Sequence, residues 1–329
     1  MEMRVESDSP IFVVGCPRSG TTLVRDLLRS HPRLTFPGES YFVPVFYRAY
    51  GAPRDARQAV QLGARILDTW WVSLWQLPLG PEDFADCRSY CQVVCRLYEA
   101  WARQENKPRW GDKTPAYLAW MPLLLELFPN AKFIHVYRDG RDVALSWLRT
   151  RWDPGNLYVA ARLWKRRVRR GRQIGATLPR STYLEVRYET LLAQPRETMQ
   201  QVCDFVGEPF DEVVLRPSRL VLSSVRRDTG GEAASLTEIV TGNRNKWKRE
   251  MPRADRVLFE SVAGDLLDEL GYETEGCRRV ISGPERWMWE CHHRAKWFLL
   301  RLTGRVLRFR HLVSLARMRW ALLRAGLGL

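Results

Sequence analysis

Short apolar runs alternate with longer stretches of helical periodicity along the first two-thirds of the chain. Three runs, at residues 11–14, 132–137 and 182–186, lack the two-residue alternation of a half-exposed strand. Strands of this kind are typical of a parallel sheet that helices cover on both faces. The pattern therefore predicts an α/β domain of three layers, with a central parallel sheet flanked by helices.

Apolar positions that recur every three or four residues predict eight helices. These helices span residues 22–30, 57–75, 83–104, 117–127, 141–149, 156–176, 188–206 and 253–270. A segment between Pro209 and Pro252 is rich in Gly, Ser and Arg and has weak periodicity, which is typical of a functional or disordered loop. Helical periodicity returns from Pro284. We therefore expect a main domain over residues 1–276 and a helical C-terminal extension over residues 277–329.

The C-terminal extension is basic and amphipathic. After Glu290 there are nine Arg and Lys residues and no acidic residue, so +6 of the net charge of +15 remains for the first 290 residues. Helices of this kind lie on anionic membranes, pack on their own domain or pair with a second copy of the chain, and all three stay open for residues 284–329. No nucleic-acid-binding motif accompanies the charge. An apolar stripe repeats along it, at Ala295, Leu299, Leu302, Val306, Phe309, Val313, Ala316, Trp320 and Leu323.

The composition is that of a folded globular protein, with 45% hydrophobic and 27% charged residues among 329. The chain has no apolar run long enough to span a bilayer, and its polar N-terminus does not resemble a signal peptide. Seven scattered cysteines argue against a disulfide framework and for a reducing compartment. We expect a cytoplasmic protein with possible peripheral membrane contact. Cys87, Cys91 and Cys95 are expected in the core rather than in a metal site.

The sequence GCPRSGTT, from Gly15 to Thr22, follows the first apolar run and precedes a helical stretch. Strand, tight glycine loop and helix together point backbone N–H groups at a phosphate. The spacing is that of the phosphate-binding loop G-x-x-x-x-G-K-[ST], but Thr21 stands in the lysine position and Arg18 lies inside the loop. Because that lysine reaches the β- and γ-phosphates of ATP, this loop is predicted to hold a phosphate without being built for ATP. An ATP-dependent small-molecule kinase is therefore the less favoured alternative.

Three further segments carry polar motifs. They read FPGES at residues 36–40, RWGDKTP at 109–115 and FIHVYRDGRDVALS at 133–146. In the third segment, Arg138 follows a predicted parallel strand, at the edge of an α/β sheet where ligands collect.

Taken together, residues 11 to about 272 resemble the sulfotransferases that use 3′-phosphoadenosine 5′-phosphosulfate (PAPS), particularly the tyrosylprotein sulfotransferase-like branch. The resemblance implies that the loop holds the 5′-phosphosulfate, that Arg138 and Ser146 hold the 3′-phosphate, and that two later residues contact the nucleotide. It also implies that Glu39 and Lys113 are catalytic, together with Arg18 of the loop. The cofactor-binding set is then Arg18, Ser19, Gly20, Thr21, Thr22, Arg138, Ser146, Tyr188 and Lys246.

Two departures from the branch concern the acceptor more than the cofactor. Where the branch has a second cofactor arginine, this chain has Thr150, between Arg149 and Arg151. The branch's late active-site serine has no unique counterpart here. The residues near its position are Ser224, Gly230, Gly231 and Ser235.

The chemistry of sulfuryl transfer assigns roles to these residue types. Arginine donates parallel hydrogen bonds to a phosphate, and Lys113 with Arg18 can stabilise charge on the leaving oxygen. Glu39 can take the acceptor proton as a general base. Since a sulfuryl group carries less charge than a phosphoryl group, these cations can replace Mg²⁺, and no metal is expected. His31 and His135 are expected to be structural, in a turn and in a buried strand.

The predicted function is therefore transfer of the sulfuryl group of PAPS to an acceptor hydroxyl, with release of adenosine 3′,5′-bisphosphate (PAP). A glycan, a lipid-linked sugar, a tyrosine and a small alcohol are all compatible acceptors. A catalytically inactive nucleotide-binding scaffold at a membrane is a second alternative, which the retention of Glu39 and Lys113 disfavours.

Overall fold

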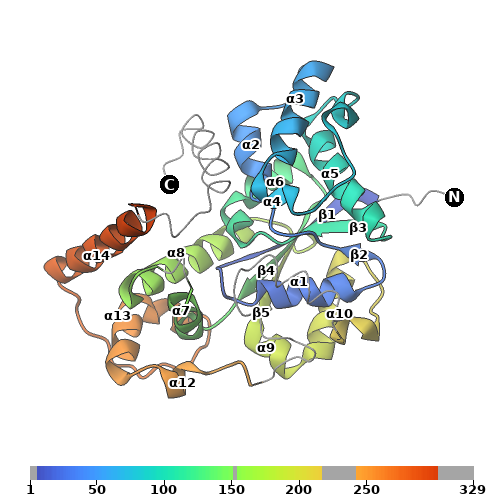
Figure 1. Cartoon of the computed structure of the whole chain (residues 1–329). Helices are drawn as coiled ribbons and strands as arrows, with labels where there is room; N and C mark the ends of the chain where they lie inside the picture. The colour runs from blue at the N-terminus through green and yellow to red at the C-terminus, as the bar shows by residue number, and fades with distance from the viewer. Residues whose placement is uncertain (1–5, 151–153, 217–241, 303–329) are drawn as a thin grey trace.

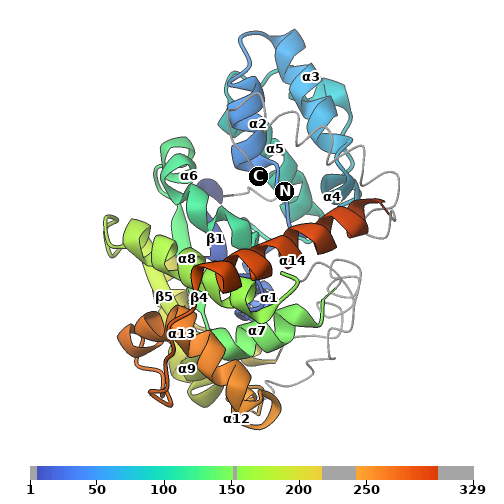
Figure 2. The same cartoon turned by 90° about the vertical axis from the view of Figure 1, so that its left-hand side faces the viewer.

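The computed structural model describes residues 6–150, 154–216 and 242–302, and Figures 1 and 2 show it from two sides. In this part of the chain, five parallel strands form one sheet in the order β2-β3-β1-β4-β5. The sequence-based prediction of a central parallel sheet is confirmed. The strands are β1 (Glu6–Gly15), β2 (Leu34–Thr35), β3 (Arg109–Asp112), β4 (Lys132–Tyr137) and β5 (Tyr183–Arg187).

The central strand β1 is buried on both faces, which explains its continuous apolar sequence. Ile11 and Val13 pack into one core cluster, while Phe12 and Val14 pack into the cluster on the other side of the sheet. All four side chains are fully buried. Successive strand residues point to opposite faces, so a strand that is apolar throughout must be covered twice.

The helices follow from this arrangement (Figure 1). The cluster around Ile11 and Val13 is covered by α1 (Thr21–Ser30), α9 (Tyr188–Ala193), α10 (Pro195–Val206) and the short η3 (Glu212–Leu215). The cluster around Phe12 and Val14 is covered by the segments α2 (Val43–Tyr50), α3 (Ala56–Leu67), α4 (Trp70–Ser73), η1 (Pro81–Phe84), α5 (Tyr90–Gln104), η2 (Pro115–Trp120) and α6 (Met121–Leu127).

A further cluster of buried residues joins α7 (Gly140–Leu148), α8 (Leu157–Gly175) and α13 (Arg253–Glu269), with the single-turn α12 (Trp247–Glu250) alongside α7. The C-terminal helix α14 (Gly283–Leu302) runs along α8, as Figure 2 shows. Asn156 donates to the carbonyl of Trp289 at 2.9 Å, and Arg162 pairs with Glu290 at 2.9 Å. The described part of the extension therefore docks on its own domain. Of the predicted apolar stripe, the positions from Val306 onward lie outside the described residues.

Two strands and the helical segments α2, η3 and α12 were not predicted from the sequence. β2 has only two residues, and β3 reads RWGD, which has the composition of a polar loop. All four residues of β3 are nevertheless buried, because neighbouring strands and α5 enclose them. α2 was missed because its Val-Pro start hides its periodicity, and η3 and α12, of four residues each, lie in the segment of weak periodicity.

Four predicted helices were too long, and the structure divides each of them. Thr69 is extended between α3 and α4, and the helix expected over residues 83–104 is divided between η1 and α5, with Ser89 capping α5 by accepting from the N–H of Gln92 at 3.2 Å. Gln194 interrupts the helix expected over residues 188–206, because the following Pro195 disfavours the helical conformation of the residue before it. Pro122 stands likewise at the start of α6, after η2, within the stretch expected to be helical over residues 117–127.

Candidate active site

The glycine loop connects β1 directly to α1, as the sequence predicts. Thr21 and Thr22 begin the first turn of α1. The N-cap residue is Gly20, which has no side chain to cap the helix, and the first turn contains no acidic residue. The first N–H groups of a helix have no partner within the helix, and the helix dipole favours negative charge there. The loop and helix start are therefore suited to an anionic group.

Gly20 is required at its position for two reasons. Its φ of +96° lies in the left-handed region that favours glycine. A Cβ atom at Gly20 would also lie 2.2 Å from Cδ2 of Tyr188, a residue that follows β5. The ring of Tyr188 therefore lies directly against the loop, as its predicted role in nucleotide contact requires.

Ser19 and Arg18 face different surroundings within the loop. Ser19 is fully buried, and its hydroxyl has no hydrogen-bond partner among the described residues. Arg18 has a positive φ of 71° and is exposed, and its Nε donates to Oγ of Ser146 at 3.0 Å. The loop and the RDGRDVALS motif, which lie 128 residues apart, thus meet through two of the predicted cofactor residues.

Arg138 lies at the carboxyl end of β4 and is 5% exposed. Its Nη2 donates to Asp142 at 3.0 Å and to the carbonyl of Asn243 at 2.8 Å. The guanidinium lies over the ring of Tyr188, 4.4 Å from its centroid, and the side chain of Asn243 donates to the Tyr188 hydroxyl at 2.8 Å. Nε of Arg138 is buried without a partner among the described residues. Nε is thus a buried donor that lacks a hydrogen-bond partner among the described residues.

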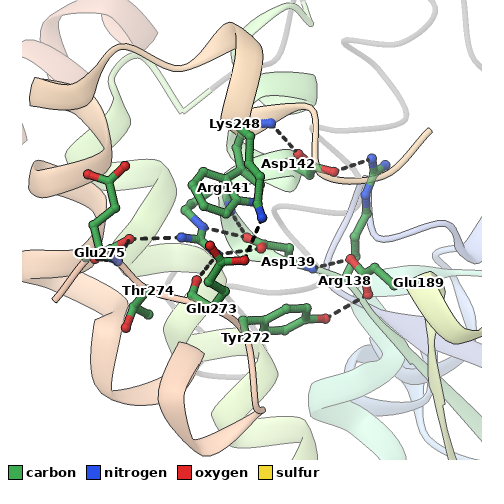
Figure 3. A network of polar contacts seen from close by, with 12 residues as sticks. Arg138, Asp139, Arg141, Asp142, Glu189, Lys248, Tyr272, Glu273, Thr274 and Glu275 are labelled. Atoms are coloured by element: carbon green, nitrogen blue, oxygen red, sulfur yellow. Dashed lines mark hydrogen bonds and ion pairs between the residues drawn. The ribbon is translucent and has the colours of Figure 1, made fainter. Parts of the chain in front are cut away.

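A buried polar network lies next to Arg138 and is connected to it (Figure 3). Arg141, which is fully buried, forms ion pairs with Asp139 at 2.8 Å and Glu260 at 2.9 Å and donates to the carbonyl of Glu273 at 2.7 Å. The ring of Trp247 stacks on its guanidinium, 3.4 Å from the ring centroid. Removing one partner from such a buried pair strands a charge, so this network fixes the start of α7.

The same network holds the segment that follows the late loop. The N–H of Trp247 donates to Oδ1 of Asp142 at 2.9 Å, while the other carboxylate oxygen accepts from Arg138. Lys246 precedes Trp247 and is half-buried at the start of α12. Because Trp247 and Arg138 both bond to Asp142, the neighbouring Lys246 lies near Arg138. This network includes no contact between the side chains of Lys246 and Arg138. The late-loop positions Ser224, Gly230, Gly231 and Ser235, and Arg151, lie outside the described residues.

Glu39 and Lys113 are in direct contact, although 74 residues separate them. Lys113 follows β3, is 2% exposed, and donates from Nζ to Oε1 of Glu39 at 2.5 Å. The Glu39 side chain is 26% exposed, so it is the more accessible member of the pair. The other carboxylate oxygen, Oε2, accepts a hydrogen bond from the hydroxyl of Tyr41.

The charges around Glu39 favour its ionised form. Burial raises the pKa of Glu39, but the charge and hydrogen bond of Lys113 and the hydrogen bond from Tyr41 outweigh burial and hold the pKa below its usual value. Arg25 of α1 adds a further positive charge from below the loop. Arg18 lies within electrostatic reach of both Glu39 and Arg138. The two halves of the site, one around Glu39 and one around Arg138, are therefore joined by the loop arginine.

Three residues of this site could not be predicted from the sequence motifs. Tyr41 and Arg25 have ordinary sequence surroundings, and only the fold brings them to Glu39. Asn243 lies in the loop that shows no periodicity, and its partner Arg138 is 105 residues away. The nearness of Tyr41 to Glu39 in the ESY sequence was the one signal that could have found it.

The two histidines are structural, as expected. His31 contacts the carbonyl of Pro209 at 2.9 Å in the turn after α1. His135 is fully buried in β4, its Nδ1 lies 2.6 Å from the hydroxyl of Tyr183, and burial lowers its pKa to about 3. Cys87 is buried in the core, while Cys91 and Cys95 pack partly buried against it. Among the described residues, no group of three His, Cys, Asp or Glu side chains is placed to hold a metal ion.

The fold and the site define an α/β protein with a phosphate-type glycine loop between β1 and α1 and a carboxylate–lysine pair, Glu39 and Lys113. The family model described as "Sulfotransferase family" matches residues 10–212. The chain therefore belongs to the sulfotransferase family, and its identification as a sulfotransferase enzyme is confirmed.

Named relatives share this family at low identity. A protein-tyrosine sulfotransferase of Drosophila melanogaster is 25% identical over 290 residues, covering 84% of this chain and 54% of that protein. Protein-tyrosine sulfotransferase 2 of Gallus gallus is 26% identical over 287 residues, covering 83% of this chain and 72% of the relative. This chain thus spans about half the length of the fly protein.

A solved structure agrees in fold. The sulfotransferase domain of the olefin synthase from Synechococcus PCC 7002 superposes with a TM-score of 0.57 at 24% identity, covering 82% of this chain and 96% of that domain. The likeness supports the three-layer α/β fold.

Proposed function

We propose that this chain transfers the sulfuryl group of PAPS to an acceptor hydroxyl and releases PAP. The observation that carries the proposal is the contact of Glu39 with Lys113 beside a phosphate loop that lacks the ATP-binding lysine. A kinase would need a cation in the position of Thr21. A scaffold without activity would have no use for a carboxylate kept ionised at the mouth of the site.

We expect the donor to occupy two anion sites, one at the glycine loop and one around Arg138. Ser19, whose buried hydroxyl is free of other described partners, and the first turn of α1 suit the 5′-phosphosulfate. The unpartnered Nε of Arg138 and the hydroxyl of Ser146 suit the 3′-phosphate. Tyr188, wedged against Gly20, and Lys246, beside Trp247, would then border the nucleotide between them. Thr21 and Thr22 complete the set with their hydroxyls.

PAPS supplies an activated sulfuryl group whose bridging oxygen gains charge as the bond breaks. Lys113 and Arg18 stabilise that charge, and Glu39 accepts the proton of the attacking hydroxyl. The contact between Glu39 and Lys113 couples the two roles. When Glu39 takes up the proton, its hold on Lys113 weakens, and the ammonium group is released toward the leaving oxygen.

The class of acceptor follows less directly. The relatives named above are protein-tyrosine sulfotransferases, which supports a hydroxyl acceptor and makes tyrosine one candidate beside a glycan, a lipid-linked sugar and a small alcohol. Tyr41, whose hydroxyl contacts Glu39, packs against Trp71 with 5.4 Å between the ring centroids. Aromatic rings beside the general base would suit an acceptor with a flat or apolar body.

Ligand-induced thermal stabilisation tests the donor. We expect PAP to raise the melting temperature of the protein in a concentration-dependent manner, since a ligand that binds only the folded state stabilises it. ATP with Mg²⁺ should have little effect, because the loop has no lysine for the γ-phosphate. Stabilisation by ATP–Mg²⁺ but not by PAP would instead favour the kinase alternative.

We also propose that residues 1–276 carry the reaction and that the extension, residues 277–329, brings them to an anionic membrane surface. Helix α14 presents large apolar side chains to solvent, among them Trp287 at 71% and Phe298 at 62% exposure, with the basic Arg286 and Arg294 also exposed. Within the described residues no helix is long and apolar enough to cross a bilayer, so contact would be peripheral.

Sedimentation with liposomes tests this second proposal. The protein should pellet with vesicles that contain phosphatidylserine, and a Trp287→Ser/Phe298→Ser variant should stay in the supernatant. Equal pelleting of both proteins would exclude α14 as the membrane contact. If the variant instead changes sedimentation of the free protein, the helix pairs two copies of the chain.

A further inference from the structure

The turn that carries Glu39 is held by hydrogen bonds to the segment that carries Lys113. The N–H of Ser40 donates to Oγ1 of Thr114 at 3.0 Å, and the hydroxyl of Ser40 lies 2.6 Å from that of Tyr117. The Tyr117 hydroxyl also accepts from the N–H of Val43 at 3.0 Å. These groups are buried, so the backbone on both sides of Tyr41 is fixed relative to Lys113.

Tyr41 has a strained backbone within this anchored turn. Its φ is +55°, a conformation that bulky residues rarely adopt. The N–H of Phe42 donates back to the carbonyl of Ser40 at 2.7 Å, which closes a three-residue turn with Tyr41 at its centre. Turns of this kind with a positive φ are rare and strained. Strain that persists in a well-packed surrounding is a marker of functional sites.

The strained turn directs the Tyr41 side chain back to Glu39. Its hydroxyl donates to Oε2 of Glu39, while Lys113 donates to Oε1, so that the two donors fix the carboxylate from both ends. The ring of Tyr41 packs against Trp71, which limits its alternative rotamers. Two hydrogen bonds at different oxygens determine both the position and the rotation of a carboxylate.

Resting on the proposed function, we infer that Tyr41 is a positioning residue for the general base: its hydroxyl orients Glu39 toward the acceptor and stabilises the ionised carboxylate. A general base must present a lone pair to the acceptor proton within hydrogen-bond distance. With Tyr41 on Oε2 and Lys113 on Oε1, the remaining lone pairs of Glu39 point in fixed directions. Without the Tyr41 hydroxyl, Lys113 would be the remaining donor of this pair, and the Glu39 carboxylate could rotate toward Lys113.

Several charged groups surround the pair and must be considered in any pH dependence. Lys113, Arg18 and Arg25 act on Glu39 as positive charges. The other charged groups that face the two residues are Asp112, which faces both, and Arg167 of α8, which faces Tyr41. Removing only the hydroxyl of Tyr41 leaves all of these charges in place.

The Tyr41→Phe variant tests the inference, with Tyr47→Phe as the matched control. Tyr47 is a half-buried tyrosine of α2 whose ring packs on Tyr90, 5.2 Å between centroids. Carbon-13 NMR of protein labelled at the glutamate carboxyl groups follows the titration of Glu39, whose signal is the one missing from Glu39→Gln. This measurement needs no acceptor substrate.

We expect the pKa of Glu39 to rise in Tyr41→Phe and to stay unchanged in Tyr47→Phe, since a hydrogen bond to a charged group favours the charged form. Once an acceptor is identified, kcat of Tyr41→Phe should fall about 10- to 100-fold while the KM for PAPS stays unchanged. The acidic limb of the pH–rate profile should move to higher pH.

An unchanged pKa of Glu39 in Tyr41→Phe would overturn the inference, as would a loss of activity without displacement of the acidic limb. The proposed function is tested separately by Glu39→Gln. If Glu39→Gln retained full activity, Glu39 would not be the base; if it lost activity while Tyr41→Phe behaved like wild type, only the role of Tyr41 would be wrong.

Discussion

Recognition of the 3′-phosphate by Arg138 gives the sharpest test of the donor site. The perturbation is Arg138→Lys, which keeps the positive charge and removes the planar fork of the guanidinium. In the structure Nη2 is already used by Asp142 and by the carbonyl of Asn243, while Nε is buried without a partner among the described residues. The substitution therefore removes the Nε–H donor that a phosphate would contact.

The size of the effect follows from the burial of Arg138. Its side chain is only 6% exposed, so a hydrogen bond between its guanidinium and a phosphate is shielded from water. One or two such charge-assisted hydrogen bonds contribute about 3 kcal/mol. Since about 1.4 kcal/mol corresponds to a tenfold change in affinity, Kd for PAP should rise about 100-fold.

Isothermal titration calorimetry with PAP and AMP isolates the contribution of the 3′-phosphate to binding, because AMP lacks this group. The wild-type protein should prefer PAP strongly, and Arg138→Lys should lose most of that preference while binding AMP about as well as wild type. Arg170→Lys, at an exposed position of α8, is the matched control and should bind both ligands normally. If Arg138→Lys weakened PAP and AMP equally, Arg138 would act through the fold rather than on the 3′-phosphate.

Three other substitutions test separate parts of the account. Gly20→Ala places a Cβ 2.2 Å from the ring of Tyr188 at a left-handed φ, so differential scanning fluorimetry should report a lower melting temperature and calorimetry weaker PAP binding, with the unobstructed Gly283→Ala as control; normal PAP binding would contradict the close packing. Lys113→Met should lower kcat about 100- to 1000-fold while PAP affinity stays within about threefold, and a defect confined to PAP binding would contradict its role at the leaving oxygen. His135 stays neutral in the fold because its pKa is lowered to about 3, so the unfolded chain alone takes up the proton as pH falls below about 6.5. Wild type should therefore lose about 2 kcal/mol of stability relative to His135→Leu between pH 7 and pH 5 in urea unfolding, and parallel pH dependence of the two proteins would contradict this assignment.

The sequence predicted those parts of the fold whose signal is local. β1, β4 and β5 contain short, mainly apolar runs, and the glycine loop with α1 has a fixed spacing, so each could be located from its own residues. β3 could not, because its RWGD sequence is buried only through contacts with β1, β2 and α5. The breaks at Thr69 and Gln194 were missed because helical periodicity continues across both.

The site divides in the same way. The loop around Arg18 stood out by its spacing, while Glu39 and Lys113 were singled out by the resemblance to the sulfotransferases; the structure brings these two into contact. The hydroxyl of Tyr41 on Glu39 depends on a strained turn, and no sequence pattern predicts a positive φ at tyrosine. The stacking of Trp247 on Arg141 likewise joins segments 106 positions apart, which only the completed fold brings together.

The measurement that tests the central claim most directly is transfer of label from radioactive PAPS. The wild-type protein is incubated with labelled PAPS and with a cell extract separated into lipid, glycan and protein fractions, beside Glu39→Gln. The account predicts label in an acceptor fraction with wild type, a loss of about 10²- to 10⁴-fold with Glu39→Gln, and unchanged PAP affinity of the variant. Transfer by Glu39→Gln at the wild-type rate, or a wild-type protein that binds ATP–Mg²⁺ and not PAP, would contradict it.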